Sequence, residues 1–526
     1  MSITRHRLMT TGLVPAVAGL AALTLGLSAC TTGATGSGGE RTTDTIRSTM
    51  IADPNSFYPY TASGVPGTQS SSLLYASLVA LDSDAEDGVS GDLATDWDVT
   101  PTKGTFTLRE DATCADGTTI TPNIVKDSLE EFAKTSKQKS QVFGPNTPKI
   151  TADDGAGTVS IELDKPWADM LRGLSQPEAG IVCPAGLEDP EKTATGEVEA
   201  AFSGPYTLED FKPGASVEFT LRDSGYTFPE FAEPLKGDPA KTVHFTMSTD
   251  YNSVANSMIT GDLDVATITG EPMVRFKDEE DFGSERFSVG TMFLVFNERD
   301  GRVFADADKR RAVAQAIDRS AYAKAATNGL GEPSTSFVSE TVPCANTDES
   351  RLIANDPAAA AESLDGAESV QLGTPAVAKG AGNKYVDQVV SEAGAKNTLR
   401  SVDPAGLATE LASKPESWDM AILNFINTSG TLYDGISRFT GMVTEDGGRN
   451  STGDEHKDVQ KLLAQAMAEE DESKRCEIYA KLQDRVFDQA YAVPLSGIPA
   501  QLTTAPGFEQ RIYDGLPATK TMRITK

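Results

Sequence analysis

Apolar residues follow two different periods along this chain. Residues 106–109 and 159–163 alternate apolar and polar positions, which predicts β-strands. Apolar side chains at 125, 129 and 132 recur at the spacing of one helix face. Spacing of this kind predicts helices over 127–134, 308–324, 457–469 and 472–487. Because such segments alternate throughout, the sequence predicts a mixed α/β fold rather than a sandwich or a bundle.

The first 30 residues carry the pattern of an export signal. Arg5 and Arg7 form a basic head, and an apolar stretch follows over 8–27. A stretch of this length could also be a membrane-spanning helix, but Pro15 and scattered glycines and threonines disfavour that reading. The segment Leu27-Ser28-Ala29-Cys30 resembles a bacterial lipobox. The resemblance implies a signal peptide over 1–29 and acylation of the Cys30 thiol at the mature N-terminus.

A flexible tether is predicted over 30–44, because this segment consists largely of Gly, Ser, Thr and Ala. The remaining length is too great for one simple core and predicts two or three lobes. The net charge of −31 disfavours nucleic acid and anionic lipid surfaces as partners. Only His244 and His456 follow the signal peptide, which disfavours a histidine-rich metal site and a His-based catalytic triad. We therefore predict no enzyme activity, no metal site and no cofactor.

Four further cysteines predict two disulfides. In an exported chain an even number of cysteines favours disulfides over metal ligands, and the spacings match no zinc motif. Three pairings are possible. Cys114 with Cys183 and Cys344 with Cys476 keep each bond within one lobe, and this pairing is favoured.

Several motifs, spread over nearly all of the mature chain, occur together in one known family. In chain order they are Asp92-Leu93-Ala94-Thr95-Asp96-Trp97, Ala115-Asp116-Gly117-Thr118, Ser203-Gly204-Pro205-Tyr206, Gly261-Asp262-Leu263-Asp264, Arg310-Arg311-Ala312-Val313 and Ala492-Val493-Pro494-Leu495. Together they resemble the extracellular solute-binding proteins of the peptide and nickel transporter class, called family 5.

The resemblance implies a two-lobed periplasmic-binding-protein fold of the class II type, with an extra subdomain in the N-terminal lobe. Lobe I is expected over 45–290, with the subdomain at about 82–195, and lobe II over 291–495. Residues 496–526 return to lobe I. The crossings between the lobes are expected near 290–295 and 493–496, where hinge closure would trap a ligand.

The function implied is that of a substrate-binding lipoprotein of an ABC importer. Such a protein captures a peptide or peptide-like solute at the outer face of the cytoplasmic membrane, in an extracellular or periplasmic location. Its partners are the permease subunits and, through the lipid anchor, the membrane; we expect a monomer. The alternatives are a binder of a non-peptide solute (metal chelate, opine or glycan) and a surface sensor or scaffold that transports nothing.

The ligand site is expected between the lobes. In peptide-binding members an acid in the loop after the Trp-Asp strand neutralises the ligand amine, but residues 424–430 contain none, and Asp434 is the nearest. Either the ligand has no free amine to neutralise, or Asp434 or another acid takes that role. The expected ligand contacts are Tyr60, Thr61, Ser63 and Gly64 from lobe I and Trp418, Asn424, Phe425, Asn427 and Asp434 from lobe II.

Overall fold

The computed structural model describes residues 44–525, which fall in one compact unit. The predicted signal peptide, the acylation site Cys30 and nearly all of the predicted tether lie outside these residues. Within the described part, no helix is both long enough and apolar enough to cross a membrane.

A four-stranded sheet opens the first lobe, in the order β1-β10-β9-β8. β1 is parallel to β10, so the start of the chain lies beside a segment nearly 200 residues later; the other neighbours are antiparallel. The helix α1 (Gly64–Leu74) contacts this sheet at β8. The strands are β1 (Thr45–Met50), β8 (Tyr206–Lys212), β9 (Ser216–Leu221) and β10 (Thr242–Met247).

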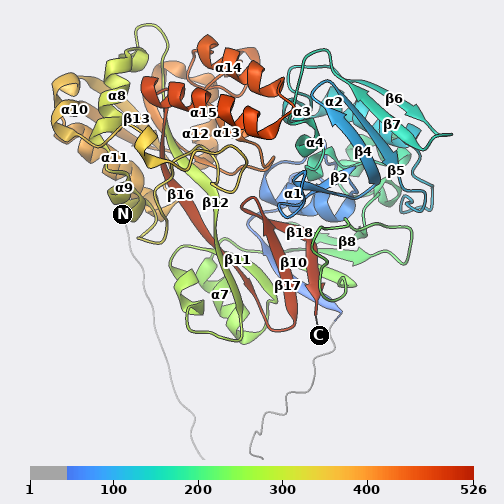
Figure 1. Ribbon diagram of the computed structural model, residues 1–526. Coiled ribbons are helices and arrows are strands. Elements are labelled where there is room, and N and C mark those ends of the chain that lie inside the picture. Colours follow the sequence, from blue (N-terminus) through green and yellow to red (C-terminus); the bar gives the residue numbers. More distant parts are fainter. Residues whose placement is uncertain (1–43, 526) are drawn as a thin grey trace, which may run out of the picture. The chain divides into compact units, whose positions relative to one another are not determined.

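A second, antiparallel sheet with the order β4-β5-β7-β6 lies in the first half of the chain (Figure 1). Its strands are β4 (Ala94–Thr100), β5 (Lys103–Leu108), β6 (Lys149–Asp153) and β7 (Thr158–Glu162). The helix α2 (Pro122–Thr135) packs on β6 and β7, and it buries Val125, Leu129 and Phe132. The strands and the helix predicted here are therefore confirmed.

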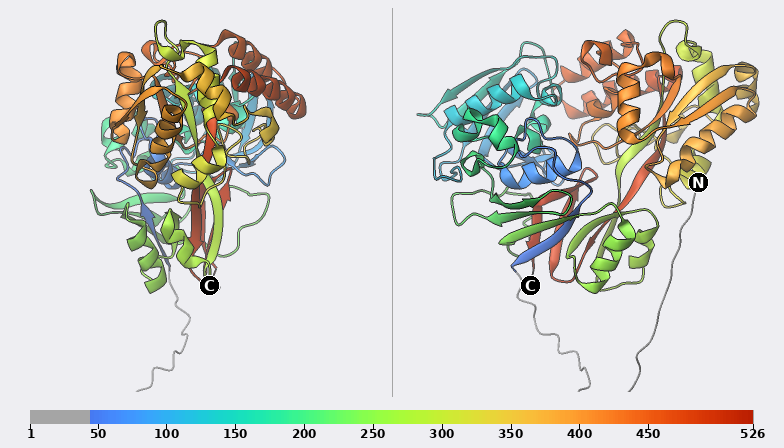
Figure 2. Two further views of the ribbon diagram at one scale, coloured as in Figure 1. Left: turned by 90° about the vertical axis from the view of Figure 1, so that its left-hand side faces the viewer. Right: turned by 180° about the vertical axis from the view of Figure 1, so that it is seen from behind.

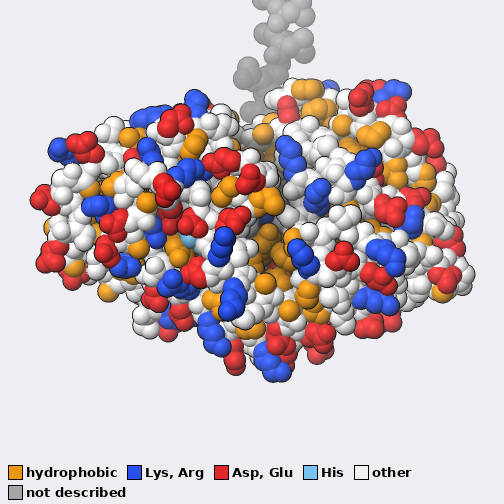
Figure 3. Space-filling view, turned by 90° about the horizontal axis from the view of Figure 1, so that it is seen from above, with side chains coloured by type: hydrophobic (Ala, Val, Ile, Leu, Met, Phe, Trp, Pro, Cys, Tyr) orange, Lys and Arg blue, Asp and Glu red, His pale blue; other side chains and the backbone are white. Residues whose placement is uncertain are grey.

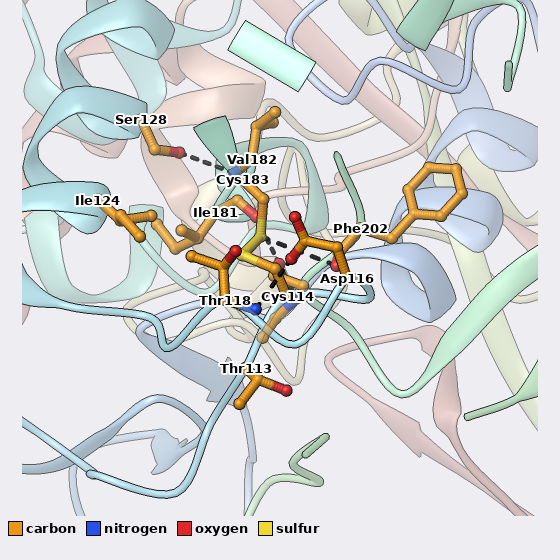
Figure 4. The surroundings of a disulfide bond; sticks show 12 residues. Thr113, Cys114, Asp116, Thr118, Ile124, Ser128, Ile181, Val182, Cys183 and Phe202 are labelled. Atoms are coloured by element: carbon orange, nitrogen blue, oxygen red, sulfur yellow. Dashed lines mark hydrogen bonds between the residues drawn. A yellow bond between two sulfur atoms is a disulfide. The ribbon is translucent and has the colours of Figure 1, made fainter. Parts of the chain in front are cut away.

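Short elements precede, interrupt and follow this sheet in the chain, and a disulfide ties the segment before α2 to the region that follows the sheet. Cys114 is bonded to Cys183, with a Cα–Cα distance of 6.0 Å (Figure 4). Both cysteines are fully buried, and the amide of Cys183 donates to the carbonyl of Ala201. The elements are β2 (Val79–Leu81), β3 (Val89–Gly91), α3 (Lys139–Phe143), α4 (Met170–Gly173), α5 (Pro184–Glu188) and α6 (Pro190–Ala194).

Two long strands join the lobes. β12 (Gly283–Phe296) and β16 (Ala492–Thr504) pair along almost their whole lengths in a six-stranded sheet of order β11-β16-β12-β15-β13-β14. In Figures 1 and 2 they run from the α7 and β11 region into the group of helices α8 to α15. Their register shifts between Ser288 and Gly290, where a Cβ atom on Gly290 would lie 2.3 Å from the carbonyl oxygen of Phe425. The other members are β11 (Val265–Thr269), β13 (Glu368–Gly373), β14 (Lys396–Ser401) and β15 (Met420–Phe425).

The second lobe is mainly helical around this sheet. Its helices are α8 (Ala307–Ala316), α9 (Arg319–Ala326), α10 (Pro357–Leu364), α11 (Ala381–Glu392), α12 (Pro404–Ser413), α13 (Leu432–Ile436), α14 (Lys457–Met467) and α15 (Glu472–Gln489). The last two confirm the helices predicted over 457–469 and 472–487. Cys344 is bonded to Cys476 in α15. Both disulfides thus have the pairing that the sequence favours.

The single helix predicted over 308–324 is wrong. α8 ends at Ala316, Ile317 has extended backbone angles, and α9 starts at Arg319. The Asp318 carboxylate accepts a hydrogen bond from the amide of Ala321 and caps α9. The Tyr385 hydroxyl accepts from the amide of Asp318 and donates to its carbonyl. Because the backbone groups at the break have these partners, the interruption costs little.

The chain ends in the first lobe with a hairpin of β17 (Phe508–Tyr513) and β18 (Leu516–Ile524). Lys520 in β18 lies 2.6 Å from the carboxylate of Asp92, whose side chain is fully buried. The amide of Ser77 and the hydroxyl of Thr227 also donate to Asp92. This carboxylate therefore holds together three parts of the lobe that are far apart in sequence. The remaining helix, α7 (Tyr251–Thr260), packs on β11.

Candidate functional site

The two lobes contact each other through several side chains and backbone groups. Gln141 of α3 donates to Asp434 of α13, and the Trp167 and Tyr433 rings pack edge to face with their centroids 4.7 Å apart. The amide of Ala168 donates to the carbonyl of Met467 at the end of α14. Seen from above, the surface is hollowed between two halves of the molecule, with hydrophobic side chains in the hollow and Lys and Arg side chains on both sides (Figure 3).

Polar side chains accumulate where α1, α3 and the short helix η1 (Pro177–Ala179) come near α13. We name this set the interlobe polar cluster: Gln138, Gln141 and Glu178 from the first lobe, and Asp434, Arg438 and Arg449 from the second. All of them except Asp434 have a buried polar atom with no hydrogen-bond partner among residues 44–525. Native interiors contain few such atoms.

Asp434 is the centre of the charges in this cluster. Its carboxylate is buried and forms an ion pair with Arg449, while a nitrogen of Arg438 lies 3.8 Å away. Gln141 adds a hydrogen bond of 2.8 Å from the first lobe. Asp434 is therefore already neutralised within the protein, and it does not offer a bare carboxylate to a ligand amine.

Arg438 lies between Asp434 and an aromatic ring. Its guanidinium carbon is 4.8 Å from the centroid of Phe425, a cation–π distance. Loss of hydration and the like charge of Arg449 lower the pKa of Arg438 to about 10, against the opposing effect of Asp434. Arg438 thus remains a cation at neutral pH.

Glu178 supplies the carboxyl group of the first lobe. One of its oxygens accepts a 2.5 Å hydrogen bond from the Thr68 hydroxyl, and the other, Oε2, has no partner in the described part of the chain. Burial raises the pKa of Glu178, the bond from Thr68 opposes this rise, and the charge of Asp434 adds to it. Glu178 therefore lies close enough to Asp434 for the two carboxyl groups to influence each other.

The loop residues predicted in the first lobe lie beside this cluster but bond within their own lobe. The buried Tyr60 hydroxyl bonds to Ser128 and to the carbonyl of Gly180. Thr61 bonds to Ser56 and to the carbonyl of Tyr58, and Ser63 bonds to Asn55. Gly64 starts α1 with a positive φ of 70°. Thr61, Ser63 and Gly64 are exposed.

The residues predicted in the second lobe divide into two groups. Phe425 and Asp434 belong with the arginines described above. Trp418 is completely buried in the core, and Asn424 lines a cavity of about 10 Å³ together with Met292 and Tyr322 of the same lobe. Asn427 bonds to Thr431 and Ser429 and shapes the loop before α13. Ligand contact by any of the predicted residues stays a prediction.

The sequence interpretation did not identify the residues that dominate the cluster. Arg449 lies in the segment 444–454, which is rich in turns and has neither a helical nor an alternating pattern. Gln138 and Gln141 belong to a short polar helix without a hydrophobic period, and Glu178 follows a proline in a single helical turn. Local patterns contain no signal for such residues, because their neighbours come from the other lobe. Among the described residues, no group of three or more His, Cys, Asp or Glu could hold a metal ion.

Comparison with known proteins gives consistent likenesses. Residues 88–376 match the family model described as "Bacterial extracellular solute-binding proteins, family 5 Middle". A stretch of 268 residues is 28% identical to the "Probable D,D-dipeptide-binding periplasmic protein DdpA" of Escherichia coli (strain K12), covering 49% of this chain and 50% of that protein. The chain thus spans about half the length of this curated relative.

Solved structures extend the likeness to almost the whole chain. A substrate-binding protein from Microbacterium hydrocarbonoxydans, complexed with 4-hydroxybenzoate hydrazide, is 39% identical with a TM-score of 0.80; the match covers 92% of this chain and 100% of that one. A dipeptide-binding protein from Pseudoalteromonas sp. SM9913, in complex with Met-Leu, has a TM-score of 0.73 at 16% identity, covering 91% and 100%. At that identity the second likeness concerns the fold alone.

Proposed function

The chain belongs to the bacterial extracellular solute-binding proteins, family 5, and from this premise we propose that it captures a peptide or peptide-like small solute and delivers it to the permease of an ABC importer. The relatives named above are binding proteins and not enzymes. Capture takes place outside the cytoplasmic membrane, and ATP hydrolysis belongs to other subunits of the importer.

The observation that carries this proposal is the interlobe polar cluster. Leaving a buried donor or acceptor without a partner costs about 1–3 kcal/mol for each group. A solute that supplies the missing partners to both lobes stabilises the closed arrangement far more than the open one. Such a difference in affinity is what a ligand needs in order to shift a conformational equilibrium.

The proposed hinge is the pair β12 and β16, at the predicted crossings near 290–295 and 493–496. A register shift in their pairing lies within or beside the first of these segments. Such an interruption removes ladder hydrogen bonds locally, bends the strand and increases its twist. Closure then brings Gln141 onto Asp434 and Trp167 onto Tyr433, the contacts described above.

Membrane attachment is part of the proposal. Acylation of Cys30 after removal of residues 1–29 would hold the protein at the outer face of the membrane as a monomer on a flexible tether. The mass of the mature protein tests this: a lipid-modified N-terminal cysteine supports the anchor, and an unmodified mature chain refutes it without affecting the binding function.

The binding function is tested by native mass spectrometry of gently purified protein, followed by thermal-shift assays with di-, tri- and oligopeptides. A co-purified small molecule, or stabilisation by peptides, supports the proposal. The variant Gln141→Leu, which removes one bond between the lobes, should bind more weakly, whereas the exposed Gln388→Leu in α11 should bind like wild type. Failure of every solute class to bind would refute the function.

A second candidate is a non-peptide solute such as an opine, a metal chelate or a glycan. It is favoured by the 39% identical relative, whose complex contains a hydrazide rather than a peptide. Stabilisation by one of these solutes with no response to any peptide would replace the peptide proposal.

A further inference from the structure

The turn at the tip of the C-terminal hairpin lies where the two lobes and the proposed hinge meet. β17 and β18 are joined by Asp514 and Gly515, which have positive φ values of 48° and 78°. Two-residue hairpin turns with both φ values positive favour the pair Asp-Gly. A Cβ atom on Gly515 would lie 2.6 Å from the carbonyl oxygen of Ser288, beside the register shift of β12. The turn therefore rests directly against one of the two hinge strands.

The carboxylate of Asp514 is buried at this tip. It accepts a hydrogen bond of 3.0 Å from the hydroxyl of Ser83, and its other oxygen lies 2.7 Å from Nη1 of Arg172 in α4. The side chains of Arg172 and Asp514 are 13% and 2% exposed. Among residues 44–525, Arg172 is the only basic residue that pairs with Asp514. Because a buried carboxylate without its cation is costly, this pair holds the guanidinium in one place.

Arg172 also reaches the second lobe. The same Nη1 atom donates to the carbonyl of Gly430, at 3.4 Å, in the loop between β15 and α13. An Nη atom of arginine has two hydrogens, so both bonds can exist together. Gly430 has a φ of 63°, and a Cβ atom there would lie 3.2 Å from the Asp514 carboxylate. The loop therefore approaches the buried pair about as closely as a glycine allows.

The surroundings that hold the guanidinium in place belong to the first lobe. The turn between β2 and β3 borders it at Gly88, where a Cβ atom would lie 2.8 Å from Nη2 of Arg172. The carboxylate of Asp82 supports this turn, because it accepts a hydrogen bond from the amide of Asp84. When the lobes separate, the bond to Gly430 is therefore lost while the other contacts of the guanidinium stay.

On the basis of the proposed function, we infer that Arg172 is a positioning residue for closure of the lobes: anchored on Asp514, it bonds to the Gly430 loop and sets the fraction of the protein that is closed. We name Arg172, Asp514 and Gly430 the interlobe latch. The latch contains no residue of the interlobe polar cluster and none of the expected ligand contacts. It therefore acts on closure and not on the choice of solute, and it acts in protein that holds no solute as well.

Small-angle X-ray scattering of the full chain without solute tests the latch, after native mass spectrometry has established that no small molecule is bound. Arg172→Gln removes the bond to Gly430 and leaves Asp514 without its cation in the closed form. The ratio of closed to open protein should fall about 10-fold, the lower end of what a hydrogen bond from a charged donor contributes, because this bond is long. The radius of gyration should therefore be larger for the variant than for wild type.

Arg172→Lys separates the latch from a merely structural role. Lysine keeps a cation for Asp514, but its ammonium nitrogen lies one bond closer to the backbone than Nη1 and no longer reaches the Gly430 carbonyl. The Tm of Arg172→Lys should therefore be close to that of wild type, while its scattering should be shifted as in Arg172→Gln.

The matched control is Arg302→Gln. Arg302 pairs with Asp419 at 3.1 Å and also donates to a backbone carbonyl, that of Trp418, but all three residues lie in the second lobe. This variant should lower Tm and leave the scattering of the empty protein unchanged. An equal shift of the scattering in this control would refute the assignment to Arg172.

Solute binding gives a second readout. A smaller closed fraction reduces the apparent affinity for every solute by the same factor. In isothermal titration, Arg172→Gln should therefore weaken the dipeptide Ala-Leu and 4-hydroxybenzoate hydrazide equally, by up to about 10-fold. Clearly different factors for the two probes would mean that Arg172 touches the solute, and the latch would be the wrong explanation.

The outcomes separate the latch from the proposed function. If Arg172→Gln scatters like wild type, or if Arg172→Lys restores both Tm and scattering, the latch is wrong while the solute-binding function stands. If the scattering shifts as expected but no solute of any class binds, the latch stands and the proposed function fails.

Discussion

The buried ion pair between Asp92 and Lys520 allows a sharp test of what holds the C-terminal hairpin in the first lobe. Lys520→Met removes the ammonium group 2.6 Å from a carboxylate whose side chain is fully buried. The hydrogen bonds from Ser77 and Thr227 remain, but they carry no balancing charge. Breaking a buried pair by removing one partner costs about 3–5 kcal/mol, because the other charge stays buried alone.

This free energy converts into a measurable shift of the melting temperature. An unfolding entropy of about 2.1 cal/mol/K per residue gives roughly 1 kcal/mol per degree for a chain of about 480 ordered residues. Lys520→Met should therefore lower Tm by about 3–5 °C in differential scanning calorimetry. The control is Lys149→Met, which removes an ion pair of similar length, 2.9 Å, whose side chains are 72% and 49% exposed. It should shift Tm by less than about 1 °C.

A double variant isolates the charge. Asp92→Asn combined with Lys520→Met leaves no buried charge at this position and should recover a large part of the lost stability. If Lys520→Met is no more harmful than Lys149→Met, or if the double variant is as unstable as the single one, then the buried charge is not what stabilises the hairpin.

Three further predictions follow from other parts of the structure. The Tm of Glu178→Gln should rise relative to that of wild type as pH rises from about 4.5 to about 8. Burial raises the pKa of Glu178, so the folded wild type holds this proton more tightly than the unfolded chain does and loses stability as pH rises. Glutamine has no such proton, so the variant does not lose this stability. An equal difference in Tm at both pH values would contradict this. Cys344→Ser with Cys476→Ser opens a link of 132 residues and should cost about 5 kcal/mol in the chain-entropy model, which lowers Tm by about 5 °C. When a reductant is added, the Tm of this variant should fall further only by the amount that the other disulfide contributes. Asp318→Ala removes the cap of α9 and should cost about 1 kcal/mol in chemical denaturation, whereas Asp308→Ala in the first turn of α8 should cost less.

The sequence predicts the fold well because the signals for it are local or belong to the family. Val125, Leu129 and Phe132 form one buried helix face, as their spacing predicts. The two-lobed α/β fold and the family are confirmed by the comparisons. The helix over 308–324 was predicted wrongly because Asp318 is compatible with a helix interior by composition, and its role as a cap depends on Tyr385 from a distant segment.

The candidate site is much less predictable, for a physical reason. Asp434 is the acid nearest to the loop after the Trp-Asp strand in the sequence. Whether its carboxylate is available to a ligand amine depends on Arg438 and Arg449, which contact it only in the folded protein. Glu178 has no local pattern that distinguishes it from a surface glutamate; only its burial beside Asp434 and Thr68 does so. Because residues of both lobes form the site, no single stretch of the sequence contains all the residues that determine its chemistry.

The shared sheet also limits how the lobes can rotate relative to each other. β12 and β16 carry both lobes on one continuous pair of strands, so any rotation is a torsion of that ribbon rather than a sliding of two surfaces. At Gly290 the ribbon has no room for even a methyl group beside the Phe425 carbonyl. A side chain at this position would push against the Phe425 carbonyl and set a permanent angle between the lobes, so a residue that is not itself an expected ligand contact would change the resting geometry of the protein.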